Sequence, residues 1–136
     1  MKKDIAIRWV EALRSGNYGQ ASFRLKDDDK YCCLGVLCEI TQDQHAWRFR
    51  ENTLILDEQA EYEVLPLLLR EAFGITSNQQ DDFTSMNDDT GLSFVQIADY
   101  IQAKFIDETF DGGPDAWCAE NQIGPYATEF DDATEP

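Results

Sequence analysis

Residues 30–38 read KYCCLGVLC, and this short run decides the fold. Arranged as a helix, it places one apolar stripe on Leu34, Leu37, Cys38 and Thr41. A free cysteine packs as a small apolar side chain, so the run is predicted to form the central buried helix. Gly35 costs a helix interior up to about 1 kcal/mol. Its presence indicates that another element crosses the helix closely at that point.

Metal binding and nucleophilic catalysis explain these cysteines less well than burial does. Structural zinc needs four ligands in short-spaced pairs, but the chain has no CxxC and a single histidine, His45. A catalytic cysteine needs a positive setting and a base, whereas the surroundings here are acidic. Residues 87–91 resemble a calcium loop, yet Met86 and Ile97 would occupy positions that require carboxylates. We therefore predict no metal site and no cofactor, and we assign no catalytic residue.

The segment before the buried helix predicts one helix and one strand. Residues 4–14, DIAIRWVEALR, have the apolar spacing of an amphipathic helix, with Asp4 as its N-cap. In residues 22–26, SFRLK, Phe23 and Leu25 alternate with basic residues, as in a half-buried strand. The acidic run DDDK that follows is typical of a tight turn.

The segments after the buried helix complete an α+β pattern. Residues 47–57 predict a hairpin, 58–63 a polar connection, and 65–74 a helix with Pro66 in its first turn. Residues 75–91 are expected to form a loop. Ser93 then opens a helix through a Ser93-x-x-Gln96 capping box. The predicted fold is three or four helices packed on a small antiparallel sheet.

Charge divides the chain into two unequal parts. The whole chain has a net charge of -16, but residues 1–50 carry nine basic and seven acidic residues. Residues 51–136 carry two basic and twenty acidic residues. Such a surface repels nucleic acid and anionic membranes and attracts basic partners, although acidity also serves solubility alone. Residues 1–106 are predicted to form the compact domain, and 107–136 an acidic extension whose aromatic residues pack on the domain or on a partner.

Three sequence blocks resemble a known set of proteins. They are WVEALRSGNYGQ, YCCLGVLC and NDDTGLSFVQIADYI, which cover residues 9–20, 31–38 and 87–101. In this order they are similar to a set of small uncharacterised proteins of bacteriophages, prophages and bacterial genomes. The resemblance implies a shared fold and a phage or mobile-element origin. It implies no activity.

Three functional hypotheses remain open at the level of sequence. The first is a non-catalytic interaction protein that binds a basic host protein through its acidic surface, including as an anti-defence mimic of DNA. Its candidate partner-binding residues are Asp107, Glu108, Asp111, Asp115, Trp117, Glu120, Glu129, Asp131 and Asp132.

The second hypothesis is a small enzyme or nucleotide-binding protein with a pocket beside the three blocks. Its candidate ligand-binding residues are Arg14, Tyr18, Gln20, Tyr31, Asn87, Asp88 and Ser93. Each of these residues also has a structural explanation, such as a helix cap or a turn. The third hypothesis is a virion or structural accessory protein.

The expected location is the cytoplasm of a bacterial cell. No apolar run approaches the roughly 20 residues that span a bilayer. The N-terminal residues scatter charge through their apolar positions, unlike a signal peptide.

Overall fold

The computed structural model describes residues 1–42, 47–56, 60–62 and 65–123, and it confirms the α+β class. Its α-helices are α1 (Lys3–Arg14), α2 (Cys33–Thr41), α3 (Leu67–Phe73), α4 (Ser77–Thr84), α5 (Phe94–Ile101) and α6 (Pro114–Asn121). Two π-helical turns continue α4 and α5, namely η2 (Ser85–Asp89) and η3 (Gln102–Ile106). The prediction of three or four helices was therefore too low.

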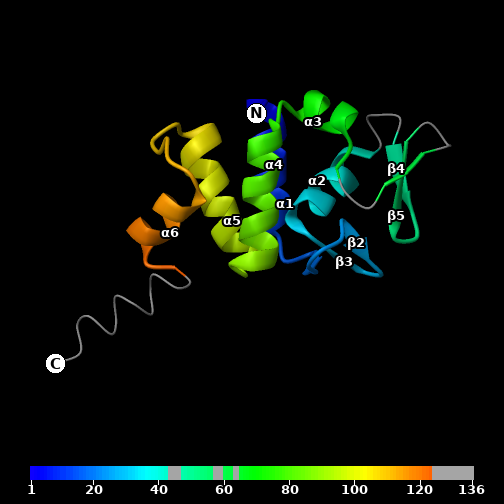
Figure 1. The fold of residues 1–136 in the computed structure, drawn as a ribbon, viewed down its shortest axis with the longest axis horizontal. Coiled ribbons are helices and arrows are strands. Elements are labelled where there is room, and N and C mark those ends of the chain that lie inside the picture. The colour runs from blue at the N-terminus through cyan, green and yellow to red at the C-terminus, as the bar shows by residue number, and fades with distance from the viewer. Residues whose placement is uncertain (43–46, 57–59, 63–64, 124–136) are drawn as a thin grey trace.

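The helices and strands separate along the long axis of the molecule. α1, α4 and α5 lie side by side in the middle, and α6 covers one end beyond α5 (Figure 1). The hairpin of β4 (Trp47–Arg50) and β5 (Thr53–Leu56) lies at the opposite end. None of the helices within the described ranges is long and apolar enough to cross a lipid bilayer.

Helix α2 is the buried centre that the cysteine run predicts. Every residue from Cys33 to Cys38 is buried, and the four cysteines of the chain are free and buried. The close crossing at Gly35 is also confirmed: a Cβ built there would lie 1.7 Å from the carbonyl oxygen of Leu25. The helix starts later than the run itself, because Cys32 is its N-cap and its thiol accepts a hydrogen bond from the Gly35 amide.

Two small three-stranded sheets flank the helices. One has the order β1 (Gly19–Gln20), β3 (Lys30–Tyr31), β2 (Lys26–Asp27), and β1 pairs with β3 in parallel. The other is antiparallel, with the order β4, β5 and β6 (Ala60–Tyr62). The predicted hairpin of residues 47–57 is thus confirmed over its described part, but the predicted polar connection of residues 58–63 contains a strand.

Two other predictions were wrong for identifiable reasons. Residues 75–91 are not a loop, because a capping box between Thr76 and Gln79 starts α4 and the chain stays helical through η2. Phe23 does not face inward from a strand: it has a φ of 69° and is 75% exposed. Leu25 alone of that predicted strand is buried, beneath Gly35.

Helix α5 organises the other half of the core. Its predicted capping box is present, with Ser93 accepting from the Gln96 amide. Tyr100 of α5 makes edge-to-face contacts with Phe110 and Trp117, at ring centroid distances of 6.3 and 6.1 Å. Residues beyond the predicted domain boundary at 106 are therefore part of the packed core.

Candidate functional site

Asn87 joins three distant segments of the chain. Its side-chain oxygen accepts hydrogen bonds from Gln20 Nε2 at 3.0 Å and from the Cys33 amide at 3.1 Å. Its side-chain nitrogen donates to the carbonyl oxygen of Ala21 at 2.8 Å. Asn87 is only 3% exposed, and a buried amide must be satisfied in this way. The structure thus brings the predicted residues Gln20 and Asn87 together, and their hydrogen bonds serve to hold the fold.

Asp88 extends this cluster to a loop with an unusual backbone. Its Oδ1 accepts from Asn87 Nδ2 at 2.8 Å and from the Phe23 amide at 3.0 Å. The φ of 69° places Phe23 in the left-handed region, which is costly for a bulky residue. Backbone strain of this kind persists where the surroundings enforce it and is common at binding sites.

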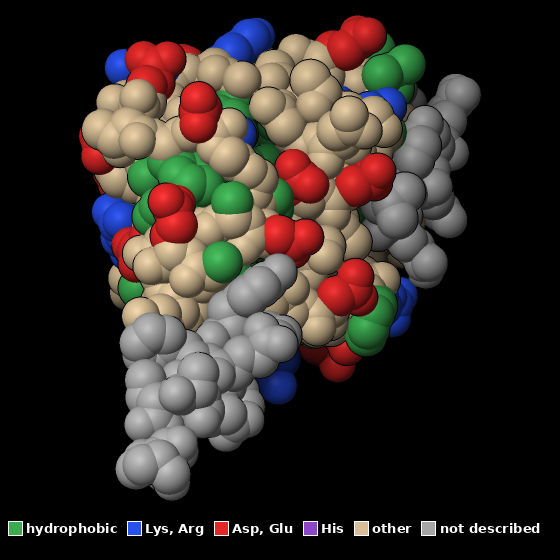
Figure 2. Space-filling model, turned by 60° about the vertical axis from the view of Figure 1, so that its left-hand side comes forward, with side chains coloured by type: hydrophobic (Ala, Val, Ile, Leu, Met, Phe, Trp, Pro, Cys, Tyr) green, Lys and Arg blue, Asp and Glu red, His purple; other side chains and the backbone are tan. Residues whose placement is uncertain are grey.

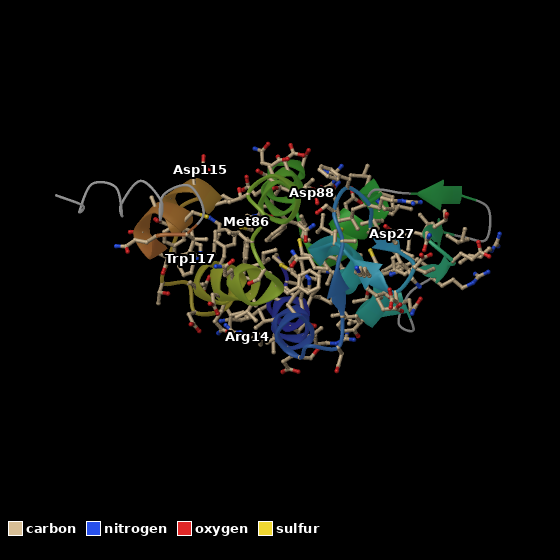
Figure 3. The ribbon with its side chains drawn as sticks, turned by 90° about the horizontal axis from the view of Figure 1, so that it is seen from below. Arg14, Asp27, Met86, Asp88, Asp115 and Trp117 are labelled. Atoms are coloured by element: carbon tan, nitrogen blue, oxygen red, sulfur yellow. The ribbon has the colours of Figure 1, made fainter. Side chains whose placement is uncertain are left out.

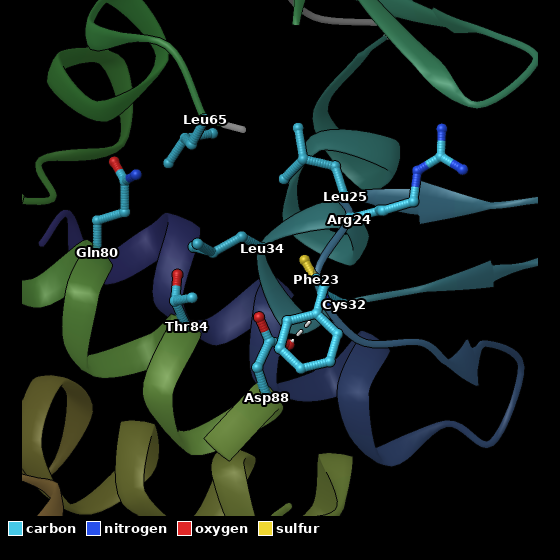
Figure 4. A pocket seen from close by; sticks show the side chains of 9 residues that line it. All are labelled: Phe23, Arg24, Leu25, Cys32, Leu34, Leu65, Gln80, Thr84 and Asp88. Carbon is cyan, nitrogen blue, oxygen red and sulfur yellow. Dashed lines mark hydrogen bonds between the residues drawn. The ribbon is translucent and has the colours of Figure 1, made fainter. Parts of the chain in front are cut away.

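A cavity of about 60 Å³ opens beside this loop, between α4 and the N-terminus of α2 (Figure 4). Its walls come from three leucines, and its polar groups come from α4, η2 and the α2 cap. The lining residues are Phe23, Arg24, Leu25, Cys32, Leu34, Leu65, Gln80, Thr84 and Asp88. The Arg24 side chain extends away from Gln80 and Thr84 (Figure 4).

Gln80 contributes an unsatisfied group to this cavity. Its side-chain oxygen is buried and has no hydrogen-bond partner. A buried acceptor without a donor is costly, so this oxygen lowers the stability of the fold. The cavity therefore combines apolar walls, one aromatic ring and unused acceptors.

The thiol in the cavity is a poor nucleophile. Burial raises the pKa of Cys32 to about 11, against the opposing effect of its backbone hydrogen bonds. Burial likewise raises the pKa values of Cys33 and Cys38. These thiols are protonated at neutral pH and therefore unreactive. His45 lies outside the described residues.

The other candidate ligand-binding residues lie elsewhere. Arg14 forms an ion pair with Asp99 at 2.8 Å, and Ser93 caps α5. Tyr31 donates its hydroxyl hydrogen to Glu39, and burial, followed by this hydrogen bond, raises the pKa of Tyr31. Tyr18 packs edge-to-face against Tyr31, with ring centroids 5.6 Å apart. The structure thus gathers Gln20, Asn87 and Asp88, but it does not bring Arg14, Tyr31 and Ser93 into one site.

Acidic side chains concentrate at the end of the molecule formed by α4, α5 and α6. Residues 74–123 contain ten Asp or Glu residues and one basic residue, Lys104. Figure 2 shows a face on which Asp and Glu are scattered widely while Lys and Arg stay near the margins. Within the described ranges, two of the ten are ion-paired: Asp99 with Arg14, and Glu108 with Lys3 at 4.0 Å.

A groove of about 450 Å³ runs between α4 and α6 at this end. Its lining residues are Asp82, Ser85, Gly113, Pro114, Asp115 and Ala116. Burial raises the pKa of Asp82, Lys104 opposes the shift, and the neighbouring carboxylates of Asp81 and Asp115 add to it. Carboxylates are thus crowded along this groove, which we call the acidic groove.

The candidate partner-binding residues fall partly on this end. Asp115 and Trp117 belong to α6, far from Asp27 of the β2–β3 hairpin (Figure 3). Asp111 and Glu120 are exposed beside them. Three other candidates, Glu129, Asp131 and Asp132, lie outside the described residues.

Sequence reasoning missed the α4 residues of both sites. Gln80 and Asp82 fall in the segment that was predicted to be a loop, so no face could be assigned to them. The Thr76-x-x-Gln79 capping box was the available signal.

Comparison with known protein families gives a match over the N-terminal part of the chain. A family model described as a domain of unknown function (DUF8296) matches residues 1–79. No curated protein and no solved structure matches the chain.

Proposed function

This chain belongs to the DUF8296 family of domains of unknown function, and on that premise we propose that it is a non-catalytic binding protein. Its acidic end, formed by α4, α5 and α6, binds a basic surface of a partner protein. The acidic groove between α4 and α6 is the observation that carries this proposal. A surface on which carboxylates outnumber cations steers and retains a partner of opposite charge.

The chemistry of the polar residues favours binding over catalysis. The buried thiols are protonated, and the amide of Asn87 is fully engaged in holding three segments together. Lys104 donates to the carbonyl oxygens of Asp111 and Gly112, at 3.1 and 2.6 Å, and so it helps to shape the groove. The carboxylates of Asp111, Asp115 and Glu120 are exposed, so they can meet a partner.

A sharper form of the proposal is that the acidic end imitates nucleic acid. The partner would then be a host protein that binds DNA, as expected of an anti-defence protein of a phage or prophage. In that form duplex DNA competes for the partner, and binding weakens steeply as salt rises.

The test is a capture experiment with a matched pair of variants. One variant carries Asp81→Asn, Asp111→Asn, Asp115→Asn and Glu120→Gln around the acidic groove. The control carries Asp4→Asn, Glu11→Gln, Asp27→Asn and Asp29→Asn, which remove four exposed charges elsewhere. We expect the first variant to lose a basic protein that the tagged wild-type chain captures from bacterial lysate at low salt, and the control to retain it.

Two outcomes would overturn the proposal. Equal capture by the two variants would show that the acidic end is not the interface. Capture that is unchanged at high salt would show that charge does not drive the interaction. If duplex DNA fails to compete for the partner, only the nucleic-acid mimicry is refuted, and the proposal of an acidic interface stands.

A further inference from the structure

We propose that the exposed face of α6 binds a basic amphipathic helix of the partner protein. This inference rests on the proposed function, because it specifies which element of the acidic end makes the contact and which kind of segment it receives. α6 has eight residues, and Cys118 is its only buried one. Its outer surface is therefore open to a partner at the end of the molecule (Figure 1).

Small apolar side chains form the centre of this face. Ala116 and Ala119 are exposed, and residues three apart are neighbours on a helix surface. Their methyl groups let a second helix approach α6 closely, since the distance between packed helices depends on the side chains at the contact. Trp117 lies beside them with a half-buried ring, and aromatic residues are enriched in the cores of protein interfaces.

Carboxylates lie on both sides of the two alanines. Asp115 is one helical turn before Ala119, and Glu120 is one turn after Ala116. An amphipathic helix has polar positions on both sides of its apolar stripe. Basic residues at those positions can therefore reach Asp115 and Glu120 while the apolar stripe covers the alanines. Helices of coiled coils select their partners by the same combination of an apolar seam and flanking charges.

The acidic groove continues this face toward α4. Asp115 and Ala116 line the groove together with Asp82 and Ser85 of the opposite wall. A helix that lies on α6 thus also enters the groove. Lys104, the basic residue at this end, donates its ammonium hydrogens to backbone carbonyl oxygens of the connection between η3 and α6, so it is bound within the chain.

Charge favours a foreign segment over the chain itself as the occupant of this face. Residues 124–136 contain four acidic residues and no basic one. A second copy of the chain carries the same net charge of -16. Both are repelled by a face flanked with carboxylates. A basic segment of another protein is therefore the occupant that complements this face.

α6 also has little to hold it in the absence of a partner. Isolated helices of fewer than about 12 residues are marginal in water, and α6 depends on Cys118 and on the ring contacts of Trp117. A helix packed on the exposed face supplies further contacts. Binding is therefore expected to slow the hydrogen exchange of the α6 amides.

The experiment titrates the ¹⁵N-labelled full chain with three synthetic peptides at constant ionic strength. The first is a helix of lysine, leucine and alanine with a single apolar stripe. The second has the same composition in an order that scatters leucine around the helix, and the third has glutamine in place of leucine. We expect the first peptide to bind roughly tenfold more tightly than the others, with saturable shifts and slower hydrogen exchange at the α6 amides.

Two matched variants test the contact itself. Ala119→Gln places a longer polar side chain in the centre of the face and is expected to weaken binding of the first peptide roughly tenfold. Glutamine is a good helix former, so α6 is expected to stay folded. Leu67→Gln, at an exposed apolar position on α3 away from α6 (Figure 1), is expected to leave binding unchanged.

The peptide series separates this inference from the proposed function. Equal binding of the three peptides would show that charge alone attracts them, which would refute the helix site on α6 and leave the acidic interface standing. Shifts confined to other elements, or no binding of any peptide, would also refute the inference. Because the titration needs no partner from a lysate, its failure is distinct from failure of the capture experiment.

Two measurements without peptide test the other occupants of the face. Shifts at α6 that grow with protein concentration would assign the face to a second copy. Hydrogen exchange in α6 as slow as in α5 would show that the chain itself already covers the face. Either result would overturn the inference.

Discussion

Gly35 shows how a single residue sets the packing of this fold. A Cβ at this position would lie 1.7 Å from Leu25 O and 2.7 Å from Leu25 C, both backbone atoms that cannot rotate away. The intrinsic preference for alanine in a helix is therefore outweighed by a backbone clash. The segment that carries Leu25 can cross α2 closely only because position 35 has no side chain.

Gly35→Ala is expected to lower the free energy of unfolding by about 3 kcal/mol, through overpacking. Urea denaturation followed by circular dichroism measures this loss. Gly113→Ala is the control, because a Cβ there meets nothing within 4 Å and its φ is -92°. Gly113 is the N-cap of α6, where alanine is less favourable than glycine, so this change is expected to cost about 1 kcal/mol or less. A similar loss in both variants would contradict the argument.

Phe23 offers the opposite case, in which substitution is expected to stabilise the protein. Asparagine tolerates a positive φ better than a bulky residue does, and the exposed ring contributes little burial. Phe23→Asn is expected to raise the free energy of unfolding by about 1 kcal/mol.

Urea denaturation of the variant measures this gain. Ser22→Asn, at a neighbouring exposed position without a positive φ, is expected to leave the free energy of unfolding nearly unchanged. A less stable Phe23→Asn protein would show that the ring is needed for folding instead.

At the scale of elements, α6 is anchored to α5 by aromatic contacts. The Trp117 ring lies 5.2 Å from that of Phe110 and 6.1 Å from that of Tyr100. Its Nε1 is buried but has no hydrogen-bond partner. The ring, not the indole N–H, therefore holds the helix in place.

Substitution at Trp117 separates these two contributions. Trp117→Ala is expected to cost about 2 kcal/mol because it removes a half-buried aromatic ring. Trp117→Phe keeps a ring and loses no hydrogen bond, so its cost is expected to stay below about 1 kcal/mol. Chemical denaturation of the two variants side by side checks this order, and equal losses would contradict it.

The helices and strands also show which elements could be predicted from the sequence and why the others could not. Strong local signals succeeded: the capping box at Ser93, the apolar stripe of α5, and Gly35 as a close crossing. Helix α4 was not predicted, because its sequence SNQQDDFT is polar and Phe83 is its only buried residue. The parallel pairing of β1 with β3 was not predicted, because strands of two residues are too short to show an alternating pattern in the sequence.

The candidate site was less predictable than the fold. Gln20, Asn87 and Asp88 were selected from the resembling blocks, and they do meet, although 67 residues separate Gln20 from Asn87. Gln80 and Phe23 were not selected. An unsatisfied buried oxygen and a positive φ are properties of three-dimensional structure, and neither is visible in the residue type.

At the scale of the whole molecule, charge is distributed unevenly and its effect depends on pH. The pKa of Asp82 is raised by burial and by nearby carboxylates in the folded protein. The folded state therefore binds a proton at Asp82 more tightly than the unfolded state does. Ionised Asp82 consequently destabilises the fold at neutral pH, and this effect disappears below the reference pKa of 3.8, where both states are protonated.

Asp82→Asn is accordingly expected to raise the melting temperature at neutral pH and to leave it nearly unchanged below pH 3.8. The gain at neutral pH is also expected to shrink as salt screens the neighbouring carboxylates. Thermal melts across pH and salt measure both dependences. Asp27→Asn, on the distant β2–β3 hairpin, is the control. A lower melting temperature of Asp82→Asn at neutral pH would refute the claim that ionised Asp82 destabilises the fold.

The hydrogen bonds of Asn87 indicate that the structural unit extends beyond the residues matched by the family model. The family match ends at residue 79, yet Asn87 satisfies Gln20, Ala21 and Cys33, all of which lie inside that match. Helix α1 likewise packs against α5, which lies outside it. In related chains, Gln20 and Asn87 are therefore expected to be kept or replaced as a pair, and an alignment that stops at residue 79 would separate positions that evolution must change together.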